Sequence, residues 1–150
     1  MQARIKNPAA TVPDALQPLV KLGKIVTSGP IPSKTLELVH LRVSQINGCA
    51  CCIEMHIAKG QDDTPLRLGM VAVWRDAPFF TPAERAALAL AESVTKIADV
   101  ADRVPDDVWA EAARHYDEPA LATLVLHIGM VNLYNRVNVA TRQVPGQKSW

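Results

Sequence analysis

The chain has few aromatic residues and no excess of charge of either sign. Phe, Trp and Tyr make up 5% of its 150 residues, whereas 49% of the residues are hydrophobic. This composition is typical of packed helices and is too apolar for a disordered chain. Sixteen basic and fifteen acidic side chains give a net charge of +1. We therefore do not expect the basic surface that nucleic-acid binding requires.

Long apolar segments are also missing. The first sixteen residues, MQARIKNPAATVPDAL, lack the apolar stretch of a secretory signal. The longest apolar run, residues 121–134, is shorter than the roughly 20 residues that cross a bilayer. It is also interrupted by His127, Gly129 and Asn132. We expect a cytoplasmic protein that does not enter a membrane.

The alternating pattern of β-strands is absent, and helical signals take its place. Pro65, Pro82 and Pro119 each precede an apolar run. Proline suits the first position of a helix because the N–H that it lacks would have no partner there. These signals predict an all-α, single-domain bundle of about seven helices. The expected helices are 13–27, 33–47, 50–60, 65–75, 82–98, 105–115 and 119–140.

All three cysteines lie within residues 49–52. The disulfide framework of an extracellular protein joins distant segments, which this cluster cannot do. Neighbouring thiols in a cytosolic chain favour reactivity or metal binding instead. The cysteine motif would lie in a core of about residues 20–100, followed by a C-terminal helical part at 105–140 of the same domain, 1–150.

The spacing around the cysteines predicts an activated thiol. The Asn-Gly pair at 47–48 ends a helix, so a new helix should begin near Cys49. Cys49, Cys52 and His56 are then spaced i, i+3 and i+7 on one face, whereas Cys51 points elsewhere. A helix N-terminus, a C-x-x-C partner and an imidazole each lower the pKa of a thiol from about 8.5. His56 can take the proton of the thiol one turn before it.

Glu37 is the acidic residue that the predicted helix hairpin brings level with His56. It lies 11 residues before Gly48, and His56 lies 8 residues after it. At about 1.5 Å of rise per residue, both sit roughly 12–17 Å from the turn on facing helices. A carboxylate there would orient and charge the imidazole, as the third member of a triad does. The alternative is a first-turn acid that favours its helix after the cap Ser33.

A metal site remains an alternative, because C-x-x-C can form half of a zinc site. No second pair of ligands is apparent, since His40, His115 and His127 are scattered singly along the chain. We interpret His127 as a hydrogen-bonded core residue. The asparagines at 132, 135 and 138 predict a buried polar seam between helices. We therefore expect no bound metal and no cofactor.

Four of these residues together resemble a known family. Glu37, Cys49, Cys52 and His56 match the pattern E-x11-C-x-x-C-x3-H of the alkylhydroperoxidase AhpD family, within the carboxymuconolactone decarboxylase-like superfamily. The resemblance covers roughly residues 20–145. It extends to the segments SQINGC at 44–49, WRDAPFFT at 74–81 and NRVNVA at 135–140.

The resemblance implies an antioxidant dithiol peroxidase that assembles into homo-oligomers, trimers or hexamers. In the family's scheme Cys52 would attack a hydroperoxide, and Cys49 would donate a proton and then close a disulfide. His56 and Glu37 match the proton-relay positions. The implied partners are the hydroperoxide and a dithiol reductant such as a lipoyl or thioredoxin-like protein.

One departure from the family concerns the residue between the paired cysteines. AhpD itself has a histidine there, where this chain has Cys51. The resemblance thus leaves part of the relay unassigned. A thiol–disulfide oxidoreductase or redox sensor with little peroxidase activity is the alternative function. A metal-binding protein and a decarboxylase are less favoured, since the decarboxylases do not use such a cysteine pair.

Overall fold

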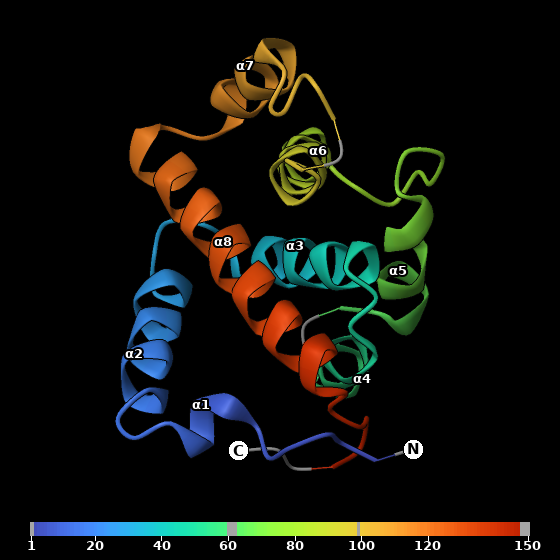
Figure 1. Ribbon diagram of the computed structural model, residues 1–150. Coiled ribbons are helices and arrows are strands. Elements are labelled where there is room, and N and C mark those ends of the chain that lie inside the picture. The colour runs from blue at the N-terminus through green and yellow to red at the C-terminus, as the bar shows by residue number, and fades with distance from the viewer. Residues whose placement is uncertain (1, 60–62, 99, 148–150) are drawn as a thin grey trace.

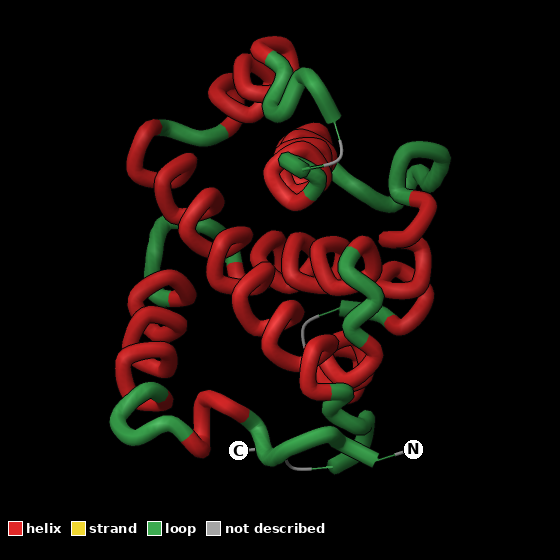
Figure 2. The backbone as a smooth tube through the Cα atoms, in the orientation of Figure 1, coloured by secondary structure: helices red, strands yellow, loops and turns green. Residues whose placement is uncertain are grey.

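The structure is a computed structural model that describes residues 2–59, 63–98 and 100–147. Within these ranges every regular element is a helix and no strand occurs, as Figure 1 and Figure 2 show. The predicted all-α class is therefore confirmed. The elements are α1 (Pro8–Thr11), α2 (Leu16–Thr27), α3 (Ser33–Ile46), α4 (Ala50–Lys59), α5 (Pro65–Met70), the 3₁₀-helix η1 (Val71–Val73), α6 (Pro82–Thr95), α7 (Asp106–His115) and α8 (Glu118–Thr141).

All seven expected helices are present, as α2 to α8, although α2 begins at Leu16 and not at 13, and α6 ends at Thr95 and not at 98. Two further differences concern α1 and α5. The short helix α1 was not predicted, because four residues carry no periodic pattern. The helix predicted at 65–75 ends at Met70 and continues as η1. The carbonyl groups that follow η1 bind the Arg85 guanidinium instead of extending a helix. The predicted end of the 50–60 helix, residue 60, lies outside the described residues.

Helix α3 lies at the centre of the bundle, where it packs against α4, α6, α8 and η1. Helix α8 crosses it diagonally and reaches from α7 at one end to α4 at the other (Figure 1). The main apolar core lies between α3, α6 and α8 and includes the fully buried Val39, Leu90, Leu124 and Ile128. Burial on several sides is what the strongly apolar sequence of α8 predicts. No described helix is long and apolar enough to cross a membrane.

Candidate functional site

The turn between α3 and α4 is built by Gly48 and closes the helix hairpin. Gly48 has φ of 66°, in the left-handed region that glycine adopts without strain. The N–H groups of Gly48 and Cys49 donate to the carbonyls of Gln45 and Ser44, at 3.2 and 3.0 Å. This is the Schellman arrangement that ends many helices. The sequence prediction of a helix stop at 47–48 is confirmed.

The predicted asparagine seam on α8 holds this turn in place. Asn47 Nδ2 donates to the Oδ1 atoms of Asn132 and Asn135, at 3.0 Å each. Asn135 in turn donates to Ser44 Oγ at 3.1 Å. Asn132, Asn135 and Asn138 are all buried, so each hydrogen bond forms where an unpaired amide would be costly. The start of α4 is therefore fixed against the long helix.

Cys49 and Cys52 form a disulfide at the N-terminal end of α4. Cys49 directly precedes the helix, and its carbonyl accepts the N–H groups of Cys52 and Ile53 at 3.1 and 3.0 Å. The exposed fractions of the two cysteines are 1% and 2%. The first turn of the helix thus places both sulfur atoms in contact inside the protein.

Cys51 does not point away from this pair, and the prediction that it would is wrong. Its Sγ lies 3.7 Å from that of Cys49, and all three sulfur atoms lie within 4.8 Å of one another. Helical spacing does not apply to Cys49, because that residue precedes the helix. Burial raises the pKa of the Cys51 thiol, and the Glu54 carboxylate adds to the rise, against backbone hydrogen bonds that lower it.

Three histidines, one each from α3, α4 and α8, lie close together in the fold. The ring centroids of His40 on α3 and His56 on α4 are 3.5 Å apart with the planes tilted by 33°, and the His127 ring on α8 lies 5.8 Å from that of His40. Helix packing thus brings together His40 and His127, which are scattered singly along the sequence. Burial, then the charges of His56 and His127, hold the pKa of His40 well below its usual value.

His127 is a hydrogen-bonded core residue, as predicted. Its Nε2 lies 3.0 Å from the Leu36 carbonyl oxygen, which fixes that nitrogen as the donor, and the buried Nδ1 has no hydrogen-bond partner among the described residues. Burial lowers the pKa of His127 to about 4, although the bond to Leu36 opposes the shift. At neutral pH the ring is uncharged.

This low pKa predicts a loss of stability in weak acid. The unfolded chain gains a proton at His127 near pH 6.5, whereas the folded protein gains it only near pH 4. Unfolding free energy should therefore fall as the pH drops through this window, by about 3 kcal/mol from this group. Urea unfolding at a series of pH values measures the fall, and His127→Gln, which cannot titrate, should reduce it. An unchanged pH profile in that variant would contradict the assignment.

Glu37 lies in the second turn of α3, half-buried and three residues before His40. The N-cap of α3 is Pro32, and no acid lies in the first turn. The alternative interpretation of Glu37 as a first-turn acid after the cap Ser33 is therefore wrong. Glu37 and His56 are carried by α3 and α4, which pack against each other.

A cavity of about 250 Å³ reaches Cys52 from one side, and we call it the Cys52 cavity. The residues that α1 and α2 contribute to its lining are apolar. The polar side chains of the lining come from the other helices. The lining residues are Ala9, Leu16, Leu19, Val20, His40, Cys52, Met55, Tyr134 and Asn138.

Asn138 gives the Cys52 sulfur a hydrogen-bond donor that the sequence did not reveal. Its Nδ2 donates to Cys52 Sγ at 3.4 Å, and its Oδ1 accepts from Asn7 Nδ2 at 3.1 Å. Because Asn7 donates to one end of the amide, the NH₂ end is turned toward the sulfur. Such a donor stabilises a thiolate more than a thiol.

A second depression, of about 320 Å³, is lined by Cys49 and Cys51 and not by Cys52, and we call it the Cys51 hollow. Only Asn138 lines both spaces. The remaining residues of the hollow come from the turn, the start of α4 and the end of α8. They are Gly48, Cys49, Ala50, Cys51, Val139, Arg142 and Gln143.

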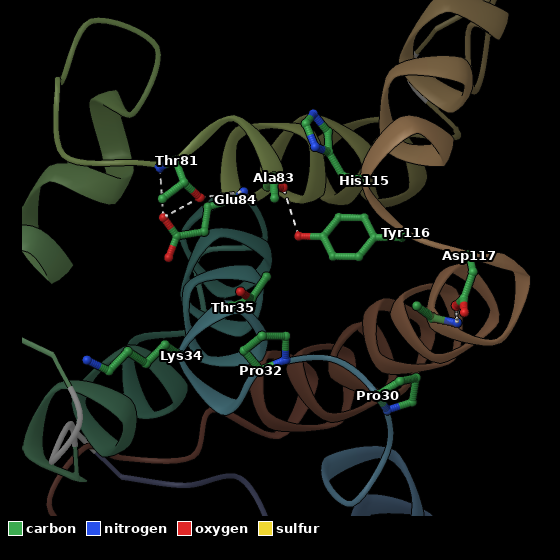
Figure 3. Close-up of a pocket in the computed structure, with 11 residues that line it drawn as sticks. Pro30, Pro32, Lys34, Thr35, Thr81, Ala83, Glu84, His115, Tyr116 and Asp117 are labelled. Carbon is green, nitrogen blue, oxygen red and sulfur yellow. Dashed lines mark hydrogen bonds between the residues drawn. The ribbon is translucent and has the colours of Figure 1, made fainter.

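The larger pocket drawn in Figure 3, about 680 Å³, belongs to another part of the fold. It lies where the N-terminal ends of α3, α6 and α8 meet, around Thr35, Glu84 and Tyr116 (Figure 3). The Tyr116 hydroxyl donates to the Ala83 carbonyl at 2.8 Å, and burial raises the pKa of Tyr116 to about 12. No cysteine lines this pocket, so we do not assign it a role in the thiol chemistry.

The chain belongs to the carboxymuconolactone decarboxylase family, whose sequence pattern matches residues 13–93. The uncharacterized protein YdfG of Bacillus subtilis (strain 168) is 37% identical over 130 residues, 85% of this chain and 87% of the relative. The uncharacterized protein YnjA of Escherichia coli (strain K12) is 32% identical over 120 residues, 79% of this chain and 64% of the relative.

Solved structures share the fold. A protein of unknown function from Agrobacterium tumefaciens, provisionally described as an antioxidant defence protein AhpD, matches with a TM-score of 0.88 and 31% identity. The match covers 98% of this chain and 100% of that one. The debrominase Bmp8 in complex with 2,3,4-tribromopyrrole matches with a TM-score of 0.74 and 23% identity, over 89% and 71% of the two chains. The predicted AhpD-like fold is thereby confirmed.

Proposed function

We propose that the protein is a dithiol peroxidase that reduces hydroperoxides through Cys49 and Cys52. The observation that carries the proposal is the disulfide between these residues at the base of a cavity that reaches Cys52. The cavity is lined by the His40 imidazole and by Asn138, whose amide donates to the Cys52 sulfur. His56 follows Cys52 by one helical turn. A nucleophile, an acid–base group and a space for substrate are the parts that a thiol peroxidase requires.

The reaction has three steps. The Cys52 thiolate attacks the outer oxygen of the hydroperoxide, so that an S–O bond forms, the O–O bond breaks and an alcohol or water leaves after protonation. The Cys49 thiol then attacks the sulfenic acid, forming the disulfide and releasing water. An external dithiol reduces this disulfide, is itself oxidised, and returns both thiols.

Proton transfer is assigned to His56 and Glu37, and His40 is assigned the positioning of the His56 ring. His56 lies one helical turn after Cys52 and would accept its proton, while Glu37 would stabilise the resulting imidazolium. His40 stacks on His56 and also lines the Cys52 cavity. Because its low pKa keeps it uncharged, His40 would hold the His56 ring in place without opposing a positive charge there.

The function is tested by a panel of hydroperoxides offered with different dithiols, including dihydrolipoamide and a reduced thioredoxin. Peroxide-dependent oxidation of at least one dithiol is the expected result. If the dithiols are oxidised only by disulfides, the protein is a thiol–disulfide oxidoreductase instead. Metal analysis of the purified, reduced protein tests the metal-binding alternative, which the Cys49–Cys52 disulfide prevents in the oxidised state.

We also propose a one-domain, cytoplasmic protein that forms a homo-oligomer, a trimer or hexamer, through the outer face of α8. Leu126 and Leu133 are 54% and 42% exposed and lie one heptad apart on this face, on either side of the exposed Gly129.

Light scattering at micromolar concentration should report an oligomer, and Leu133→Glu should dissociate it. Val73→Glu, an equally exposed site on η1, is the control. A monomeric wild type would contradict the proposal.

A further inference from the structure

Two different spaces lie beside the disulfide, and each is lined by different cysteines. The Cys52 cavity is lined by Cys52, whereas the Cys51 hollow is lined by Cys49 and Cys51. Asn138 lines both and separates them, with its Nδ2 3.4 Å from Cys52 Sγ. A peroxide and a reductant therefore need not use the same entrance.

An external thiol meets an obstacle at the disulfide itself. Cys49 and Cys52 are 1% and 2% exposed, so both sulfur atoms of the bond are covered. Cys51 is half-buried and keeps part of its surface open beside them. Exchange requires a thiolate to reach a sulfur atom of the disulfide, and access limits its rate. Cys51 is already near that bond, with its Sγ 3.7 Å from Cys49 Sγ.

We propose that Cys51 is a relay thiol that takes over the disulfide from Cys52 and presents it to a dithiol reductant in the Cys51 hollow. The inference rests on the redox function proposed above for the Cys49–Cys52 pair. In the first step the Cys51 thiolate attacks Cys49 Sγ. The Cys49–Cys51 bond forms, the Cys49–Cys52 bond breaks, and Cys52 leaves as a thiolate.

The reductant completes the relay in two further exchanges. One of its thiolates attacks Cys51 Sγ, forming a mixed disulfide and releasing Cys49, which takes up a proton. Its second thiol then closes the reductant's own disulfide and releases Cys51. The protein gains two electrons and the dithiol loses two. Arg142, which lines the hollow, would attract a reductant with an anionic group.

The protonation state of Cys51 makes it unreactive toward the peroxide. Its raised pKa leaves it mainly as a thiol at neutral pH, and thiols react poorly with peroxides. Glu54, on its own helix, is the charged group that acts on this thiol, and it favours the protonated form. Arg142 also lines the hollow. Reduction through Cys51 should accordingly become faster as the pH rises toward its pKa.

The experiment measures the two half-reactions separately in the full-length protein. Wild type, Cys51→Ser and Ala58→Ser are oxidised with diamide, and reduction by dihydrolipoamide is followed by rapid thiol quenching and mass spectrometry. In a separate measurement on the same proteins, the rate of disulfide formation by one equivalent of peroxide is determined. Ala58 is an exposed α4 residue away from both spaces, and serves as the control.

We expect Cys51→Ser to lower the rate at which dihydrolipoamide reduces the diamide-formed disulfide by at least about tenfold relative to the wild type. A smaller fall, or an equal fall in Ala58→Ser, would overturn the relay. Since diamide makes the disulfide without a peroxide, this result is independent of peroxidase activity. A protein that forms the disulfide with diamide but consumes no peroxide would refute the proposed function alone.

Discussion

Cys52→Ser is expected to abolish peroxide consumption, because a serine hydroxyl does not ionise near neutral pH and cannot replace the thiolate. In the fold, Cys52 is the cysteine that lines the cavity with His40 and accepts the Asn138 amide. The Asn138 hydrogen bond favours a thiolate at Cys52. Cys49, which lines the other space, is placed to resolve the oxidised sulfur.

A trapping experiment distinguishes the two roles. Without Cys49, a sulfenic acid at Cys52 should persist, and a 1,3-dione reagent should label it after one equivalent of peroxide. Because Cys51 lies close by, the variant should carry Cys49→Ser together with Cys51→Ser. Cys52→Ser with Cys51→Ser should remain unlabelled. Labelling of Cys49 in that second protein, with none at Cys52 in the first, would exchange the assignments.

Glu37→Gln should slow the alkylation of Cys52 and raise its apparent thiol pKa, with the fold unchanged. The amide keeps the shape of the side chain but removes the charge that would stabilise the His56 imidazolium and, through it, the Cys52 thiolate. Acid–base assistance of this kind contributes about 10²–10⁴-fold to a rate. Peroxidase turnover should fall by a factor in this range.

The measurement is the rate of iodoacetamide alkylation at Cys52 across pH, read by mass spectrometry of the reduced protein. Glu118→Gln is a matched control, since Glu118 is an exposed acid in the first turn of α8. Loss of such an acid costs about 0.3–1 kcal/mol of helix stability and should leave the thiol unaffected. If Glu37→Gln behaves like this control, Glu37 has only a structural role.

The helices were predictable because their signals are local. Proline at the first helical position, the Thr81–Glu84 capping box and the stop at Gly48 each depend on a few adjacent residues. The proximity of Cys49 and Cys52 was equally accessible, because the two residues are only three apart at the start of a helix. Glu37 and His56 could be assigned to paired helices from the length of the hairpin alone.

The parts that escaped sequence reasoning depend on contacts between distant segments. His40 is 16 residues from His56 and 87 from His127, and only the packing of α3 against α4 and α8 brings the three together. The bond from Asn138 to Cys52 spans 86 residues. Cys51 was misplaced for a local reason, since a helical wheel does not describe the residue that precedes a helix.

The two walls of the Cys52 cavity come from different stretches of the chain. Residues 9–20 supply most of its apolar wall, whereas the sulfur and the imidazole belong to the α3–α4 hairpin. Mutations of Leu16, Leu19 and Val20 can therefore alter the size and shape of the admitted molecule without disturbing the groups that react with it. Substrate choice and chemical competence can evolve separately in such a protein, provided that Asn7, which orients the Asn138 amide, is kept.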